Sequence, residues 1–199
     1  MSGTYVVAVQ GIAQAAGSVK DIPAEIRTAA KLAVNATARR TRTSAAKQIL
    51  AQVNFGASYL NENDRFTISQ FATQNDLTAK ITGRQRPTSL ARFASGQLGG
   101  RDGVTVEVAP GNTRRSKRMF LIKLRSGNAN IETKFNMGLA IRLRKGERIQ
   151  DKKKMVQLGH NLYLLYGPSI DQVFAQVADA SAPEASQFLE QEFNRLLEI

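Results

Sequence analysis

Residues 23–53, PAEIRTAAKLAVNATARRTRTSAAKQILAQV, decide the fold, because they are rich in Ala and contain neither Gly nor Pro after Pro23. Pro23 suits the first turn of a helix, and Glu25 suits the positive end of its dipole. Asn54 and Gly56 supply a stop. The stretch predicts a helix of about 30 residues, about 45 Å long. One face, spaced by three or four residues, carries the side chains expected to be buried: Ile26, Ala30, Val34, Thr37, Thr41, Ala45, Ile49 and Val53.

Alternating or β-branched stretches predict strands on both sides of this helix. Two of them, 66–71 and 77–82, flank a polar turn and predict a hairpin. The stretch 119–124, MFLIKL, is apolar enough for a central strand. The expected strands are 4–9, 66–71, 77–82, 104–108, 119–124, 139–143 and 162–166.

The C-terminal region predicts helices. Apolar residues follow helical spacing over 170–177. Ser181 and Glu184 match a capping box with Pro183 in the first turn, so a second helix is expected to begin there. Its expected apolar stripe is Phe188, Leu189, Phe193, Leu196 and Leu197.

These elements predict an α+β fold, in which a long N-terminal helix and C-terminal helices pack on a mainly antiparallel sheet with long basic loops. Without an internal repeat or a linker, residues 1–199 are expected to form a single domain. Residues 1–20 are a candidate extended N-terminal arm. The loops 125–137 and 144–158 are long enough to suggest function or mobility.

The composition argues against catalysis. The 199 residues contain no Cys, which excludes disulfides, thiolate catalysis and Cys-based zinc sites. A single histidine, His160, leaves no His-pair metal site and is interpreted as a surface or structural residue. The carboxylates are scattered, and no phosphate-binding glycine loop is present. We therefore expect no enzyme, no metal and no cofactor. The sequence also has no signal-peptide pattern and no long apolar run, so a soluble protein is expected.

The charge is large and unevenly spread. The chain has 28 Lys and Arg against 16 Asp and Glu, for a net charge of +12. Residues 80–154 hold 19 of the basic and 5 of the acidic residues, whereas residues 155–199 hold 1 and 6. A basic middle can face a polyanion, or it can meet the acidic end of a neighbouring copy. The third interpretation is a solvated surface that only aids solubility.

Three basic runs are candidates for DNA or subunit contacts. The first run, within residues 84–92, can bind phosphate. Alternatively, its arginines can pair with carboxylates and hold the irregular backbone in place, and this second interpretation is slightly favoured. No aromatic side chains interleave with these runs, so any DNA contact is expected through phosphates without sequence reading. The runs are Arg84, Arg86 and Arg92; Arg114, Arg115, Lys117 and Arg118; and Lys152, Lys153 and Lys154.

Gly167, Pro168 and Ser169 form a separate candidate, an elbow between the last strand and the C-terminal helices. Pro suits the first turn of a helix, and Gly permits a sharp change of direction. The segment either aims the C-terminal helix at a docking surface or is an ordinary strand-to-helix turn.

Four stretches resemble, in their sequence and in their order along the chain, the minor tail protein Z family of tailed bacteriophages, also called tail completion proteins. The two most distinctive lie within LTAKITGRQRPTSLARF and LYLLYGPSIDQVF. The resemblance covers about residues 22–197, but the loops 125–137 and 144–158 match nothing in it. The other two stretches are AVNATARRTRTSAAKQI and GVTVEVAPGNTRRSKRMFLIKL.

The resemblance implies a virion structural protein of the neck that is not an enzyme. Such proteins form a ring, usually a hexamer, at the head-proximal end of the tail and make the tail competent to join a head. Implied partners are tail terminator or tail tube proteins, head-completion or connector proteins, and genomic double-stranded DNA in the lumen, with no membrane. The implied location is the virion tail of a siphovirus, after assembly in the host cytoplasm. The alternative is a nonspecific nucleic-acid-binding protein that acts through basic loops.

Overall fold

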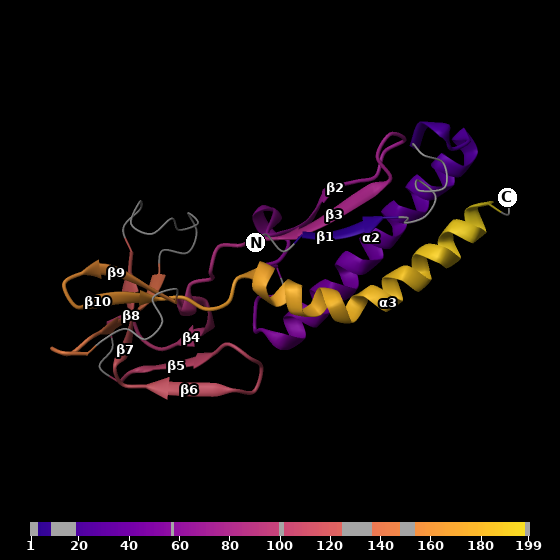
Figure 1. Cartoon of the computed structure of the whole chain (residues 1–199). Coiled ribbons are helices and arrows are strands. Elements are labelled where there is room, and N and C mark those ends of the chain that lie inside the picture. Colours follow the sequence, from indigo (N-terminus) through magenta and orange to yellow (C-terminus); the bar gives the residue numbers. More distant parts are fainter. Residues whose placement is uncertain are drawn as a thin grey trace. The chain divides into compact units, whose positions relative to one another are not determined.

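The computed structural model describes residues 4–8, 19–56, 58–99, 102–124, 137–147 and 154–197 (Figure 1). The chain forms two compact units and passes between them four times. Unit 1 comprises residues 1–50, 57–85 and 170–199, and unit 2 comprises residues 51–56 and 86–169. The single domain expected over residues 1–199 is therefore built from two units. Of the candidate arm, Thr4–Ala8 is strand β1 of unit 1, while residues 1–3 and 9–18 lie outside the described residues.

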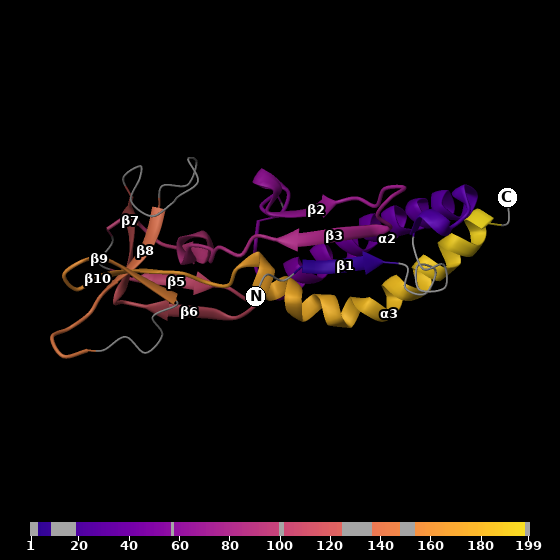
Figure 2. The same cartoon turned by 45° about the horizontal axis from the view of Figure 1, so that its top comes forward.

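In its described residues, unit 1 combines one small sheet with two long helices. Its three strands lie in the antiparallel order β1–β3–β2 (Figure 2). The predicted hairpin and the predicted long helix are both confirmed. The elements are β1 (Thr4–Ala8), the 3-10 turn η1 (Val19–Asp21), α2 (Ala24–Gln52), η2 (Glu62–Asp64), β2 (Phe66–Gln70), β3 (Thr78–Gly83) and α3 (Ile170–Leu197).

The core of unit 1 lies between one face of the sheet and the helices. The predicted stripe of α2 is buried except at the half-buried Ile26, and Ala30, Val34 and Ala45 are fully covered. From α3, Phe174 packs edge-on against Phe66, with ring centroids 4.8 Å apart, and lies 6.2 Å from Tyr5. Small side chains on α2 allow close approach, and aromatic rings fill the space that remains.

The helices of unit 1 run antiparallel. Near the end of α2, Gln48 Nε2 donates to Ser181 Oγ at 3.2 Å, whereas Phe193 packs near the α2 start against Ile22 and Ala30. The predicted break at Ser181 is wrong, because α3 continues through Pro183. Ser181 is buried and accepts its hydrogen bond from α2, so packing holds the helix together where proline removes one backbone bond.

The part of unit 2 that the structure describes contains two antiparallel sheets, of order β4–β5–β6 and β7–β8–β10–β9. Leu124, Ala140 and Leu164 form the centre of an apolar cluster on the larger sheet. The elements are η3 (Leu90–Phe93), β4 (Ala94–Ser95), β5 (Val104–Glu107), β6 (Thr113–Ser116), β7 (Met119–Lys123), β8 (Met137–Arg142), β9 (Met155–Gly159) and β10 (Leu162–Leu165).

The prediction that residues 119–124 form a central strand of a sheet is wrong. The apolar stretch 119–124 is β7 and lies at the end of the sheet, where a single bridge from Leu98 to Leu121 contacts its other side. The central strands are β8 and β10. Strand β9 falls mostly within the expected loop 144–158, and β6 lies in the polar stretch between the expected strands 104–108 and 119–124. Both are edge strands, which can expose polar side chains and need no apolar alternation. Of the expected loop 125–137, residues 125–136 lie outside the described residues.

The α+β class is confirmed, with two helices and mostly antiparallel sheets in the described chain. None of the helices in the described residues is long and apolar enough to cross a membrane.

Candidate nucleic-acid interface

The division into units also separates the charge. Unit 1 contains 11 Lys and Arg and 11 Asp and Glu, so its formal net charge is zero. Unit 2 contains 17 basic and 5 acidic residues, which gives +12. The whole net charge of the protein is therefore carried by unit 2, which makes unit 2 the candidate location of a site for a polyanion.

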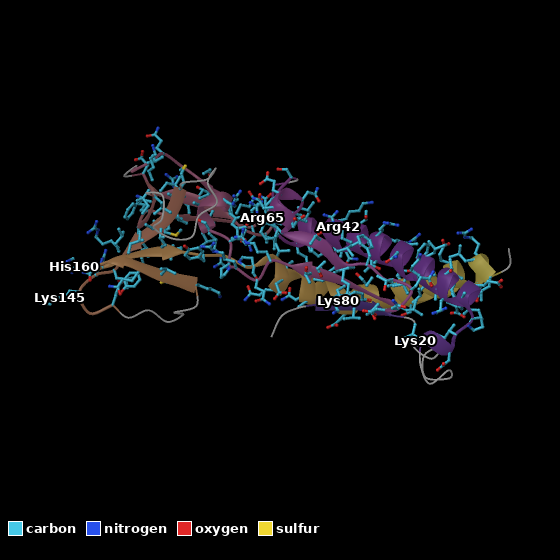
Figure 3. The ribbon with its side chains drawn as sticks, turned by 90° about the horizontal axis from the view of Figure 1, so that it is seen from above. Lys20, Arg42, Arg65, Lys80, Lys145 and His160 are labelled. Atoms are coloured by element: carbon cyan, nitrogen blue, oxygen red, sulfur yellow. The ribbon has the colours of Figure 1, made fainter. Side chains whose placement is uncertain are left out.

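Strand pairing gathers cations at one end of the larger sheet. The register of β7 and β8 pairs Met119 with Ile141, so the residues just before β7 lie beside those just after β8. In Figure 3, Lys145 and His160 lie at this end of unit 2, and Leu143 N–H donates to Asn161 O at 2.9 Å. Five cations among the described residues of this end, which we call the basic tip, are exposed: Lys117, Arg118, Arg142, Arg144 and Lys145.

A fork of hydrogen bonds links the two segments of the basic tip. Arg118 Nη1 and Nη2 donate to the two carboxylate oxygens of Glu147 at 2.8 and 2.6 Å. Glu147 also accepts from Arg144 N–H at 2.7 Å. These bonds, led by that from Arg118, hold the pKa of Glu147 down at about 2, and the same contact raises the pKa of Arg118. The pair fixes the turn after β8 against the turn before β7.

A glycine supports the turn that carries Lys117. Gly103 has φ +83°, a conformation that side chains other than Gly rarely adopt. A Cβ atom at Gly103 would lie 2.4 Å from Ser116 O and 2.7 Å from Lys117 Cα. The close approach of two backbone segments therefore requires Gly at this position.

In the second basic run, residues 114–118, two cations are bonded to other groups of the chain and two form no ion pair with a described carboxylate. Arg118 is ion-paired with Glu147, and Arg115 Nη2 donates to Asp102 O at 3.2 Å. Arg114 and Lys117 are exposed and form no ion pair with any described carboxylate. In the third run, Lys154 is exposed, whereas Lys152 and Lys153 lie outside the described residues.

The first basic run does not belong to one unit. Arg84 lies in unit 1, where its N–H donates to Arg65 O at 2.7 Å and its carbonyl accepts from Asp171 N–H at 3.2 Å. Arg86 and Arg92 lie in unit 2, and both are half-buried. Their side chains are thus less available to a phosphate than those of the basic tip.

The elbow, residues 167–169, is held in place by hydrogen bonds and packing contacts with residues 88–90. Gly167 N–H donates to Thr88 O at 2.7 Å, and Thr88 N–H donates to Pro168 O at 3.3 Å. A Cβ at Gly167 would lie 3.1 Å from Leu90 Cδ2, so a larger residue there would have to push against the Leu90 side chain, and Gly167 has no left-handed φ. The sequence suggested that Pro168 lies in the first turn of a helix. In the structure, Pro168 and the buried Ser169 both precede α3.

Sequence reasoning missed Arg142, Arg144 and Lys145 as site candidates. Each is unremarkable within its own segment, and only the pairing of β7 with β8 brings this segment beside the turn that carries Lys117 and Arg118. The signal available in the sequence was the pair of apolar stretches at 119–124 and 139–143, which could have been aligned as neighbouring strands.

His160 is exposed, and its carbonyl accepts from Gln157 Nε2 at 2.8 Å, as expected of a surface residue. The described residues contain no group of three or more His, Asp and Glu side chains that could hold a metal ion.

Comparison with known proteins finds no matching family model, curated protein or solved structure for this chain.

Proposed function

We propose that this chain is a structural subunit of a bacteriophage neck that acts without catalysis. In this proposal, copies form a ring, expected to be a hexamer, at the head-proximal end of the tail. The ring completes the tail and allows it to join a filled head, and genomic DNA passes through the lumen. The observation that carries the proposal is the complete separation of charge, with +12 on unit 2 and zero on unit 1.

The charge separation suits a subunit with two different tasks. A neutral unit with two long helices suits contacts with other protein subunits, because apolar contacts there do not have to overcome like-charge repulsion. A closed ring needs two different surfaces on each copy, related by rotation. A strongly basic unit suits a position beside the phosphates of double-stranded DNA.

The exposed position of the cations in the basic tip supports a contact with DNA that does not depend on the base sequence. Its cations are exposed and lie on turns and a strand end. Such side chains can contact phosphates at any register of a moving duplex, whereas reading of bases requires an element inserted in a groove. Weak and nonspecific contact is what passage of DNA through a lumen requires.

The proposed partners follow from the resemblance to tail completion proteins. They are tail terminator or tail tube proteins on one side of the ring and head-completion or connector proteins on the other. The proposed location is the neck of the virion, reached after assembly in the host cytoplasm.

Imaging of tails by cryo-electron microscopy tests this function. Tails from a phage that carries this gene should show a ring of the protein at the head-proximal end. Tails from the same phage without the gene should lack that ring and join heads poorly, and the plasmid-borne gene should restore joining. Absence of the protein from purified virions would refute the proposal.

A second candidate is a nonspecific nucleic-acid-binding protein with no virion role, which the charge of unit 2 also favours. It predicts tight, strongly salt-dependent DNA binding by the isolated monomer or dimer. The neck subunit instead predicts weak binding by the free chain and association with itself or with neck proteins.

A further inference from the structure

We propose that neighbouring copies of this chain bind through two different faces of unit 1, with the C-terminal half of α3 of one copy lying on α2 of the next. This inference rests on the proposed ring and identifies the surfaces that would build it.

The first surface, which we call the acceptor face, consists of Leu32 and Arg39 on α2 and Phe71 beside β2. Leu32 is 47% exposed and Phe71 is 43% exposed. The guanidinium of Arg39 lies 5.2 Å from the centre of the Phe71 ring, and Arg39 forms no ion pair with a carboxylate of the described chain. Large apolar side chains beside an available cation are typical of a binding surface.

The acceptor face is rigid, because α2 is tied to the segment that carries Phe71. Asn35 Nδ2 donates to Ala72 O at 3.0 Å, and Ala72 N–H donates to Asn35 Oδ1 at 2.8 Å. This paired bond holds the backbone next to Phe71 against the helix. A preformed surface loses little conformational entropy when a partner binds.

The acceptor face points away from the α3 helix of its own copy. The adjacent residue, Arg40, is the one that contacts α3, through Glu184 at 3.3 Å and the Phe188 ring at 4.5 Å. Arg39 is turned to Phe71 instead. The acceptor face is therefore left for a different molecule.

The second surface, which we call the donor face, is the C-terminal half of α3. No residue of α3 after Ser181 is buried in the described part of the helix, so its apolar stripe is only partly covered. Leu197 is 45% exposed. Glu190 is exposed and has no ion-pair or hydrogen-bond partner in the described chain, whereas Glu184 pairs with Arg40 and Glu192 with Arg195.

The two faces match in charge and in spacing. Leu32 and Arg39 are seven residues apart on α2, and Glu190 and Leu197 are seven residues apart on α3. Seven residues are two helical turns, about 10 Å, so both residues of each pair lie on one side of their helix. An antiparallel approach places Arg39 opposite Glu190 and Leu32 opposite Leu197. Because the two faces are different, the contact can repeat from copy to copy and close a ring.

The absence of Cys from the chain makes disulfide cross-linking a clean test. Two full-length proteins, Leu32→Cys and Leu197→Cys, are oxidised separately and as a mixture. We expect a disulfide-linked dimer in the mixture and not in either protein alone. The double variant should form a ladder of linked copies. A matched control replaces Leu32→Cys with Lys47→Cys, an exposed α2 residue outside the acceptor face, and should cross-link to Leu197→Cys at least about tenfold less.

Charge reversal provides a second readout. Arg39→Glu and Glu190→Arg should each weaken self-association on the order of tenfold, and the double variant should restore it. Lys47→Glu should leave self-association unchanged. Sedimentation velocity measures association, and circular dichroism shows that each variant is folded.

The outcomes separate this inference from the proposed ring. The inference is overturned if the protein forms oligomers but Leu32→Cys and Leu197→Cys do not cross-link, or if Arg39→Glu leaves self-association unchanged. Neither result contradicts the proposed ring. Cross-linking of either single variant to itself overturns the assignment of two different faces. Cross-linking of Leu32→Cys in intact tails to another tail protein shows a different occupant and also overturns it. A chain that is monomeric in solution and absent from tails overturns both proposals.

Discussion

The exposed cations of the basic tip can be tested through the salt dependence of DNA binding. We would change Lys117, Arg142 and Lys145 to Gln together. This triple variant removes three charges and leaves the Arg118–Glu147 pair in place. All three side chains are exposed, so the change should not disturb the core of unit 2.

The magnitude follows from counterion release. Each phosphate contact with B-DNA contributes about 0.9 to the slope of log Kobs against log salt concentration. If all three residues contact phosphate, the slope of the triple variant should be shallower by about 2.7. Over a fourfold rise in salt, the unaltered protein should then lose about 40-fold more affinity than the variant.

The assay is fluorescence anisotropy with a labelled duplex of arbitrary sequence, across a series of low salt concentrations. A matched control changes Lys20, Lys47 and Lys80 to Gln, which removes the same charge from unit 1. Figure 3 labels two of these control residues, Lys20 and Lys80, on unit 1. The control should keep the original slope. An equal reduction in both variants, or no reduction in the first, would refute the assignment of the DNA contact to the basic tip.

Three further predictions concern stability and the charge pair. Arg118→Gln should raise the pKa of Glu147 from about 2 toward its ordinary value of 4.5, measured by NMR titration of the carboxyl carbon. In the unaltered protein, the stability that this carboxylate contributes is present above pH 4.5 and is lost as the pH falls toward 2. An unchanged pKa in the variant would show that the hydrogen bond from Arg144 N–H alone keeps the pKa of Glu147 low. Gly167→Val should lower the free energy of unfolding by about 1–3 kcal/mol through overpacking against Leu90, measured by urea denaturation. An unchanged midpoint would mean that Leu90 moves aside. Phe174→Ala should lower the free energy of unfolding by about 3–5 kcal/mol, because this ring is 1% exposed and packs against Phe66. A loss below about 1.5 kcal/mol in thermal denaturation would contradict that packing role.

The sequence by itself determined the elements whose signal is local. The long helix α2 follows from a run without Gly or Pro and from a buried stripe spaced by three or four residues. Most strands follow from alternation or β-branched residues, and the excess of positive charge follows from composition. These properties are predictable because helix and strand geometry relate nearby residues by a fixed period.

Only the tertiary structure decided which elements meet. The apolar stretch of β7 lies at a sheet end, and the polar stretch TRRS is a strand, because pairing depends on distant partners. Pro183 stays inside α3 because Ser181 is buried against α2, a contact that no local capping pattern contains. The basic tip exists because β7 and β8 pair across more than a dozen intervening residues, and this long-range register places Arg142 beside Arg118. Packing and register between distant segments are physically nonlocal, and for this reason the site itself was not visible in the order of the residues.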